Sequence, residues 1–156
     1  MKRILKGTTA NTVVSRIPFV LDADNASKVS EFIRTTDAKS FQPSIQFAFK
    51  NFEESYSTHS ERQAFTSLMA AMEGLFHEPN VKEISGEIAT KCSVLMGGSS
   101  AEQASVYSNL RRLYRKRSRI LHGGSAEVVS SSDSSLLRDY VRQSIKKLIQ
   151  SGDTKD

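Results

Sequence analysis

Arg117 and His122 are the two residues of this chain whose types and spacing could do chemistry together. An imidazole titrates near neutral pH, so His122 could accept or deliver a proton. A guanidinium can hold a phosphate and stabilise the charge that develops on it, which suits Arg117 to an anionic substrate. For His122 alone, a favourable interaction with a helix dipole is the more ordinary reading.

The position of Arg117 breaks the pattern of its own helix. The sequence predicts a long helix from Ser100 to Leu121, opened by a capping box of Ser100 and Gln103 and closed by Gly123-Gly124. At about 100° per residue, Arg117 falls in the middle of the apolar arc of this helix. That arc consists of Val106, Leu110, Leu113, Tyr114, Ile120 and Leu121. Since an arginine is almost never fully buried without a partner, Arg117 must be paired, line a cleft or face another subunit.

The chain itself offers Arg117 a partner. Glu73 is expected at the edge of the apolar face of an earlier helix, so a salt bridge between the two is one reading of the pattern. On a regular helix His122 would point about 140° away from Arg117. The two glycines after His122 could let the last turn unwind and swing the imidazole. The sequence leaves open both the salt bridge to Glu73 and an approach of His122 to Arg117.

Positive charge is concentrated around these residues. The net charge is +5, from 22 Lys and Arg against 17 Asp and Glu. Six of those cations and no acid lie between Gln103 and Ala126, so the remainder of the chain has a net charge of −1. Five of the six fall opposite the apolar arc, namely Arg111, Arg112, Arg115, Lys116 and Arg119. Such a concentration favours polyanions such as nucleic acid, with an ordinary solvated helix face as the alternative.

Helical periodicity dominates the chain and predicts an all-α, up-and-down helical bundle of about five to six helices. The N-terminus is the exception. A β-branched and aromatic run over residues 12–21 predicts a short extended arm, and Asp22 or Asp24 could cap a first helix bearing Val29, Phe32 and Ile33. We therefore divide the chain into an arm with the first helix (1–40), a helical domain (41–150) and a frayed tail (151–156).

Four further helices are expected around the Ser100–Leu121 helix. The first begins near Pro43, and the second is opened by a capping box of Ser60 and Gln63 and stops before Pro79. Asn80 is expected to cap the third, which Gly97-Gly98 ends, and the last follows a serine-rich connector at 130–135. Their apolar faces are formed by Ile45, Phe49, Phe52 and Tyr56; by Phe65, Leu68, Met69, Met72 and Phe76; by Ile84, Ile88, Cys92 and Leu95; and by Leu137, Tyr140, Val141, Ile145 and Leu148.

The segment at 110–124 resembles the signature of the HEPN superfamily, and it reads LRRLYRKRSRILHGG. That signature is an R-x4-6-H motif whose first variable position is usually polar, which here matches Arg117, Ser118 and His122. The pattern LY..RS.I.HG, preceded by AMEGLF at 71–76 and a further helix, looks most like the Apea-type branch of this superfamily. The resemblance covers residues 65–124 well, 43–60 and the last helix loosely, and the first forty residues hardly at all.

The resemblance implies a bundle that dimerises so that two motifs form one composite, metal-independent endoribonuclease site. Arg117, Ser118 and His122 would be catalytic, and His122 could take the proton from a ribose 2′-OH or protonate the leaving 5′-oxygen. Contacts to RNA phosphates would come from Arg111, Arg112, Arg115, Lys116 and Arg119. The implied setting is phage defence, stress response or a toxin system, with RNA, a second copy of the chain, and an inhibitor or sensor protein as partners. Dimerisation would make the apolar stripe around Arg117 partly a subunit interface.

Two features limit which properties of the family the resemblance implies for this chain. Some HEPN toxins have a Tyr two residues after the His that a partner nucleotidyltransferase modifies, but Gly124 stands there in this chain. Other members lack nuclease activity and serve as binding or dimerisation modules. The alternative function is therefore a non-catalytic helical module that binds nucleic acid, nucleotide or a protein partner. A helical scaffold whose Arg117 is only salt-bridged is the third reading.

Composition narrows the remaining classes of protein. With 156 residues, 38% hydrophobic and 25% charged, the chain has the size and balance of one soluble globular domain. No run is long enough to span a membrane and the N-terminus lacks the apolar core of a secretory signal, so we expect a cytoplasmic protein without membrane contact. A single cysteine, Cys92, permits no internal disulfide, and with three histidines it cannot form a zinc site of the usual spacing. We expect no metal and no cofactor.

Overall fold

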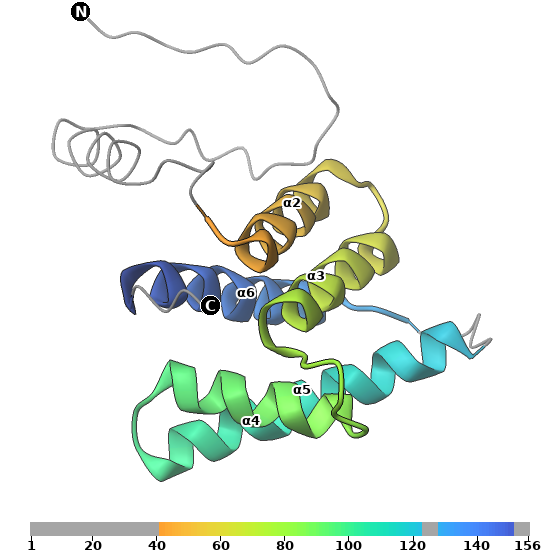
Figure 1. Cartoon of the computed structure of the whole chain (residues 1–156). Helices are drawn as coiled ribbons and strands as arrows, with labels where there is room; N and C mark the ends of the chain where they lie inside the picture. The colour runs from red at the N-terminus through yellow and green to blue at the C-terminus, as the bar shows by residue number, and fades with distance from the viewer. Residues whose placement is uncertain (1–40, 123–127, 152–156) are drawn as a thin grey trace, which may run out of the picture. The chain divides into compact units, whose positions relative to one another are not determined.

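The computed structural model describes residues 41–122 and 128–151, and these form five α-helices (Figure 1). They are α2 (Pro43–Ser57), α3 (Glu61–Phe76), α4 (Ile84–Met96), α5 (Ser100–Leu121) and α6 (Ser131–Ser151). The predicted all-α bundle is confirmed. The predicted N-terminal arm and first helix, the Gly123-Gly124 pair and the tail beyond Ser151 lie outside the described residues.

The helices pack mainly through the predicted apolar faces, but Ile84, predicted to face inward from α4, is 37% exposed at the start of that helix. α2 packs chiefly on α3, α4 packs chiefly on α5, and α6 lies against α3 with further contacts to α2 and α4 (Figure 1). The predicted inward residues of α3 are all buried, and three of its neighbours contribute fully buried side chains to the same core. Those side chains are Ile88 and Cys92 from α4, Leu110 and Leu113 from α5, and Leu137 and Val141 from α6. The reading of Cys92 as a core residue is confirmed.

The predicted inward face of α2 is wrong in part. Ile45 is buried and Phe52 partly buried, but Phe49 and Tyr56 are 42% and 50% exposed. The buried side of this helix contains Ala48, one residue before Phe49, in place of Phe49 itself. This is the side on which α2 packs against α3 and α6. Tyr56 meets the Arg138 guanidinium of α6, which lies 4.5 Å from the centre of its ring.

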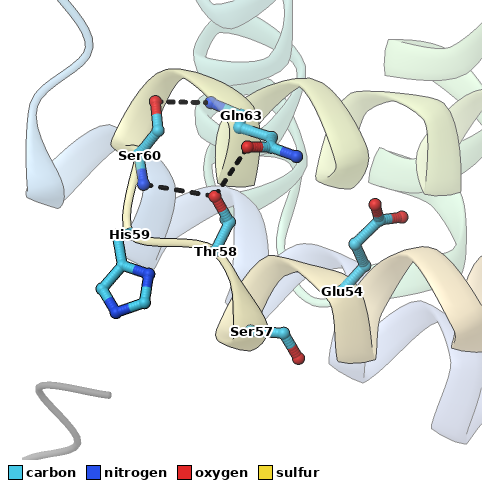
Figure 2. A pocket seen from close by; sticks show the side chains of 6 residues that line it. All are labelled: Glu54, Ser57, Thr58, His59, Ser60 and Gln63. Atoms are coloured by element: carbon cyan, nitrogen blue, oxygen red, sulfur yellow. Dashed lines mark hydrogen bonds between the residues drawn. The ribbon is translucent and has the colours of Figure 1, made fainter. Parts of the chain in front are cut away.

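The start of α3 agrees with the sequence in its cap but not in the full capping box. The Ser60 hydroxyl accepts a hydrogen bond from the Gln63 N–H at 3.3 Å, as an N-cap residue should. The Gln63 side chain does not return the bond to Ser60. It accepts one from the Thr58 hydroxyl at 2.9 Å, and Thr58 in turn accepts from the Ser60 N–H at 3.2 Å (Figure 2). Thr58 thus completes the cap.

The other helix starts are shifted from their predicted positions. α4 begins after Glu83, whereas Asn80 was the expected cap. The capping box of α5 is formed by Ser99 and Glu102, one residue earlier than predicted, because the Glu102 carboxylate accepts the Ser99 N–H at 2.7 Å. α6 begins within the expected connector, since Ser130 and Asp133 bond to each other across its first turn.

The end of α4 follows the prediction. Gly97 ends the helix with a φ of 71°, a backbone conformation that glycine adopts at little cost.

None of the helices in the described part of the chain combines the length and the apolar character that a membrane span requires.

Candidate functional site

α5 presents the predicted apolar arc to the bundle, and the burial is strongest in the middle of the helix. Leu110 and Leu113 are fully buried and Tyr114 is 7% exposed. Ile120 is only partly buried, and Leu121 is 57% exposed. The prediction that Leu121 belongs to the buried arc is therefore wrong, because the C-terminal end of α5 runs on beyond α4 (Figure 1).

Arg117 is partly buried and forms an ion pair with α3. Its Nη2 lies 2.9 Å from Oε1 and 3.0 Å from Oε2 of Glu73, and 29% of the Arg117 side chain is exposed. The Tyr114 hydroxyl donates to the same carboxylate at 3.1 Å. The salt bridge between Glu73 and Arg117, one of the three possibilities that the sequence leaves open for Arg117, is confirmed. It explains how a guanidinium is accommodated on an apolar stripe within one chain.

Tyr114 acts in this cluster as a fixed donor. Burial and the charge of the Glu73 carboxylate raise the pKa of the Tyr114 hydroxyl far above its ordinary value. The hydroxyl therefore keeps its proton throughout the neutral and mildly alkaline range. Glu73 receives two donors from successive turns of α5, Tyr114 and Arg117, and is held between them.

His122 follows the last turn of α5, where the chain leaves the helix. Its N–H still donates to the Ser118 carbonyl at 3.0 Å, but its φ of −90° and ψ of 27° depart from helical values. Arg117, Ser118 and His122 line one hollow of about 360 Å³ at this end of α5. The other residues lining it are Lys82, Glu83, Ile84, Ser85, Tyr114, Arg115 and Leu121. The motif residues share a hollow even though an ideal helix separates Arg117 and His122 by a wide angle.

The charge in this hollow is mostly positive. Lys82 and Arg115 contribute cations, and Arg117 contributes one that is paired with Glu73. Glu83 is the acid in the lining, but it accepts hydrogen bonds from the Ser85 hydroxyl and from Arg111, and these bonds lower the pKa of its carboxyl. The hollow is therefore suited to an anion. Sequence reasoning missed Lys82, which lies between α3 and α4 and carries no pattern that could have singled it out.

The predicted basic face is largely engaged within the protein. Arg111 pairs with Glu83, and both Arg112 and Lys116 pair with Asp133 of α6 at 2.7 Å. Lys116 is only 15% exposed, so the expectation of a wholly solvated face is wrong for this residue. Arg115 and Arg119 are exposed.

Asp133 is the buried acid of this region, and no pattern in the sequence indicated a role for it. Its side chain is 7% exposed. Burial alone would raise the pKa of the Asp133 carboxyl, but hydrogen bonds from Lys116, Arg112 and Ser130 outweigh that effect and hold the pKa well below its usual range. Asp133 thereby ties the second half of α5 to the first turn of α6.

The other two histidines lie in other clusters. His77 bonds through Nδ1 to Glu87 at 3.0 Å, and Lys91 bonds to the same carboxylate at 2.6 Å. Burial opposes ionisation of Glu87, yet the bonds from Lys91, His77 and the Glu78 N–H lower its pKa to about 2. His59 lines a polar hollow of about 430 Å³ between α2 and α3, together with Glu54 and residues of the α3 cap (Figure 2). Neither histidine lines the hollow that contains Arg117 and His122.

The described residues contain no group of three or more His, Cys, Asp or Glu side chains placed to hold a metal ion. Comparison of the chain with models of protein families, with curated proteins and with solved structures found no match.

Proposed function

We propose that this protein is a metal-independent RNA endonuclease of the HEPN type, with Arg117, Ser118 and His122 in its active site. The observation that carries the proposal is that these three motif residues line one cationic hollow at the end of α5. An arginine, a hydroxyl and an exposed imidazole beside further cations are suited to an RNA phosphodiester.

The reaction follows from the residue types. The ribose 2′-oxygen attacks the adjacent phosphorus while His122 takes the 2′ proton, and the bond from phosphorus to the 5′-oxygen breaks as that oxygen receives a proton. Arg117 stabilises the charge that accumulates on the phosphoryl oxygens. The Ser118 hydroxyl adds a neutral donor. The nucleophile belongs to the substrate, so the products are a 2′,3′-cyclic phosphate and a 5′-hydroxyl.

The proposed active form is a homodimer in which the R-x4-H motifs of the two copies together form one catalytic site. In a composite site one His122 can act as the base and the other as the acid. The rim of the hollow supports a second copy as partner, because two large apolar side chains, Ile84 and Leu121, are 37% and 57% exposed there. The setting proposed is cytoplasmic, in defence, stress response or a toxin system, with an inhibitor or sensor protein as a further partner.

Contacts with RNA phosphates are proposed for Arg111, Arg112, Arg115, Lys116 and Arg119. Arg115 is the strongest of these candidates, since it is exposed, lines the hollow and forms no ion pair with any residue that the structure describes. Arg111, Arg112 and Lys116 would have to exchange or share their carboxylate partners.

A second candidate function is a non-catalytic helical module that binds nucleic acid, nucleotide or a protein through the same surface. The ion pairs favour it. Glu73 gives Arg117 a role in joining α3 to α5, and Asp133 gives Arg112 and Lys116 a role in joining α5 to α6. On this account the cations stabilise the bundle and bind an anion without chemistry.

Cleavage of RNA in EDTA separates the two functions. The nuclease is expected to cut a labelled single-stranded RNA without divalent metal and to leave a 2′,3′-cyclic phosphate, while DNA of the same sequence survives because it lacks the internal nucleophile. Light scattering should show a dimer of the 17.3 kDa chain. RNA that is bound but never cut would support the binding module, and cleavage that requires a metal would overturn the proposed mechanism.

A further inference from the structure

The ion pair between Arg117 and Glu73 engages only one nitrogen of the guanidinium. Nη2 approaches both oxygens of the carboxylate, at 2.9 Å from Oε1 and 3.0 Å from Oε2. Nε and Nη1 form no hydrogen bond with any residue in the described part of the chain. Because both nitrogens carry N–H donors, Arg117 retains hydrogen-bonding capacity after the pair has formed.

Arg117 also lines the cationic hollow while it is paired, and 29% of its side chain is exposed. Arg117 therefore takes part in the ion pair and in the lining of the hollow at the same time. Nη2 is held by Glu73 of α3, and Nε and Nη1 have no hydrogen-bond partner among the described residues. A carboxylate that competed with substrate would be expected to occupy the guanidinium more fully, as bidentate pairs do.

Glu73 is itself held in place. Its Oε1 accepts from the Tyr114 hydroxyl at 3.1 Å, and Tyr114 is a buried residue of α5 located one turn before Arg117. Because the Tyr114 hydroxyl stays protonated and neutral, it does not balance the charge of the Glu73 carboxylate. It orients the carboxylate, and the carboxylate orients Arg117.

We infer that Glu73 is a positioning residue, which with Tyr114 anchors the Nη2 end of Arg117 so that Nε and Nη1 can hold a phosphodiester in the hollow. The inference rests on the proposed function for its catalytic consequence. Its structural content, a guanidinium that is fixed before substrate arrives, is independent of that function. A fixed guanidinium lowers the ordering cost of binding the transition state.

The anchor can be tested without RNA. In ¹⁵N relaxation measurements, the Nε–H of Arg117 should be as rigid as the backbone in the wild-type protein, and that of exposed Arg115 should be mobile. Glu73→Gln keeps the size of the side chain but turns an amide N–H toward Nη2, so it should make Arg117 as mobile as Arg115. Tyr114→Phe should have a smaller effect in the same direction. An Arg117 that is already mobile in the wild-type protein would overturn the inference.

Kinetics on a short RNA give the second readout. Glu73→Gln should lower kcat by about tenfold to a hundredfold, the loss expected from a misplaced catalytic group, without raising KM. If Glu73 instead competed with the phosphate, the same variant would lower KM and leave kcat undiminished, which would contradict the inference. Glu78→Gln is the matched control, because Glu78 pairs with Lys91 and does not line the hollow.

The two readouts separate this inference from the proposed function. A rigid Arg117 that Glu73→Gln releases, in a protein that cuts no RNA, would support the anchor and refute the nuclease. Cleavage by a protein whose Arg117 is mobile, or whose Glu73→Gln variant is fully active, would support the nuclease and refute the anchor.

Discussion

Replacement of Asp133 by Asn is expected to destabilise the protein, because Asp133 is a buried carboxylate that compensates two cations. Its side chain is 7% exposed, and it accepts hydrogen bonds from Arg112 and Lys116 at 2.7 Å each. The Ser130 hydroxyl donates a further bond at 2.8 Å. The variant keeps the shape of the side chain and removes its charge, so it tests the ion pairs themselves.

The magnitude depends on how far each cation can return to water. Removing one partner of a buried ion pair costs about 3–5 kcal/mol, because the other charge is left uncompensated. Lys116 is 15% exposed and approaches that limit, whereas Arg112 is 45% exposed and can rehydrate. Lys116 also donates to the Val128 carbonyl, which softens the loss. We therefore expect a fall of about 2–3 kcal/mol in the free energy of unfolding and a fall of about 5–10 °C in Tm.

Urea unfolding followed by circular dichroism measures this loss directly. Asp139→Asn is the matched control on the same helix. Asp139 pairs with Arg142, but both side chains are largely exposed, at 58% and 61%, so the control should lose less than about 0.5 kcal/mol. Equal effects of the two variants, within about 0.5 kcal/mol, would refute the argument that burial makes the Asp133 pairs strong.

Three further predictions concern a carboxylate, the thiol and an exposed arginine. Glu87 has its pKa lowered from 4.5 to about 2 in the folded state, so the stability that it contributes is present above 4.5 and is lost as the pH falls toward 2. Glu87→Gln should flatten the stability curve in that window, and an unchanged acid slope would contradict the assignment. Cys92 is fully buried and burial raises its pKa to about 11, so a thiol reagent at neutral pH should label it only at the rate of unfolding. Labelling at the rate of an exposed thiol would show that the core opens there. Arg115→Ala should weaken RNA binding and reduce the slope of log affinity against log salt by about 1, with no change in stability beyond about 0.5 kcal/mol. An unchanged salt dependence in Arg115→Ala would show that RNA binds to a surface other than the hollow.

The fold was predictable from the sequence to the extent that long apolar periodicity controls it. The inward face of α3 was identified residue by residue, because Phe65, Leu68 and Met72 repeat at helical spacing and the helix is surrounded by others. α2 was harder, because four of its residues are aromatic and only Phe52 among them packs against the core. Phe49 was assigned inward for its hydrophobicity, but the small Ala48 beside it takes the buried position.

Of the ion pairs around the candidate site, the one between Arg117 and Glu73 was predictable from the sequence and the others were not. The position of Arg117 on the apolar arc indicates an acidic partner, a cleft or a second subunit as alternatives, and Glu73 could be named as the partner because it lies at the edge of a regular helix. Asp133 and Glu83 could not be paired with the basic face, since those contacts join α5 to α6 and to the start of α4. Helical periodicity defines which side of each helix is buried, but it does not determine which surface charges meet across two helices.

The role of His122 is the central claim, and the rate of RNA cleavage in EDTA by His122→Ala tests it most directly. His59→Ala is the control, because His59 belongs to a hollow between α2 and α3 and not to the one beside Arg117. We predict that His122→Ala loses about 10²- to 10⁴-fold in rate while its unfolding curve and most of its RNA affinity stay unchanged, and that His59→Ala cuts at the wild-type rate. Cleavage by purified His122→Ala at the wild-type rate would contradict the account.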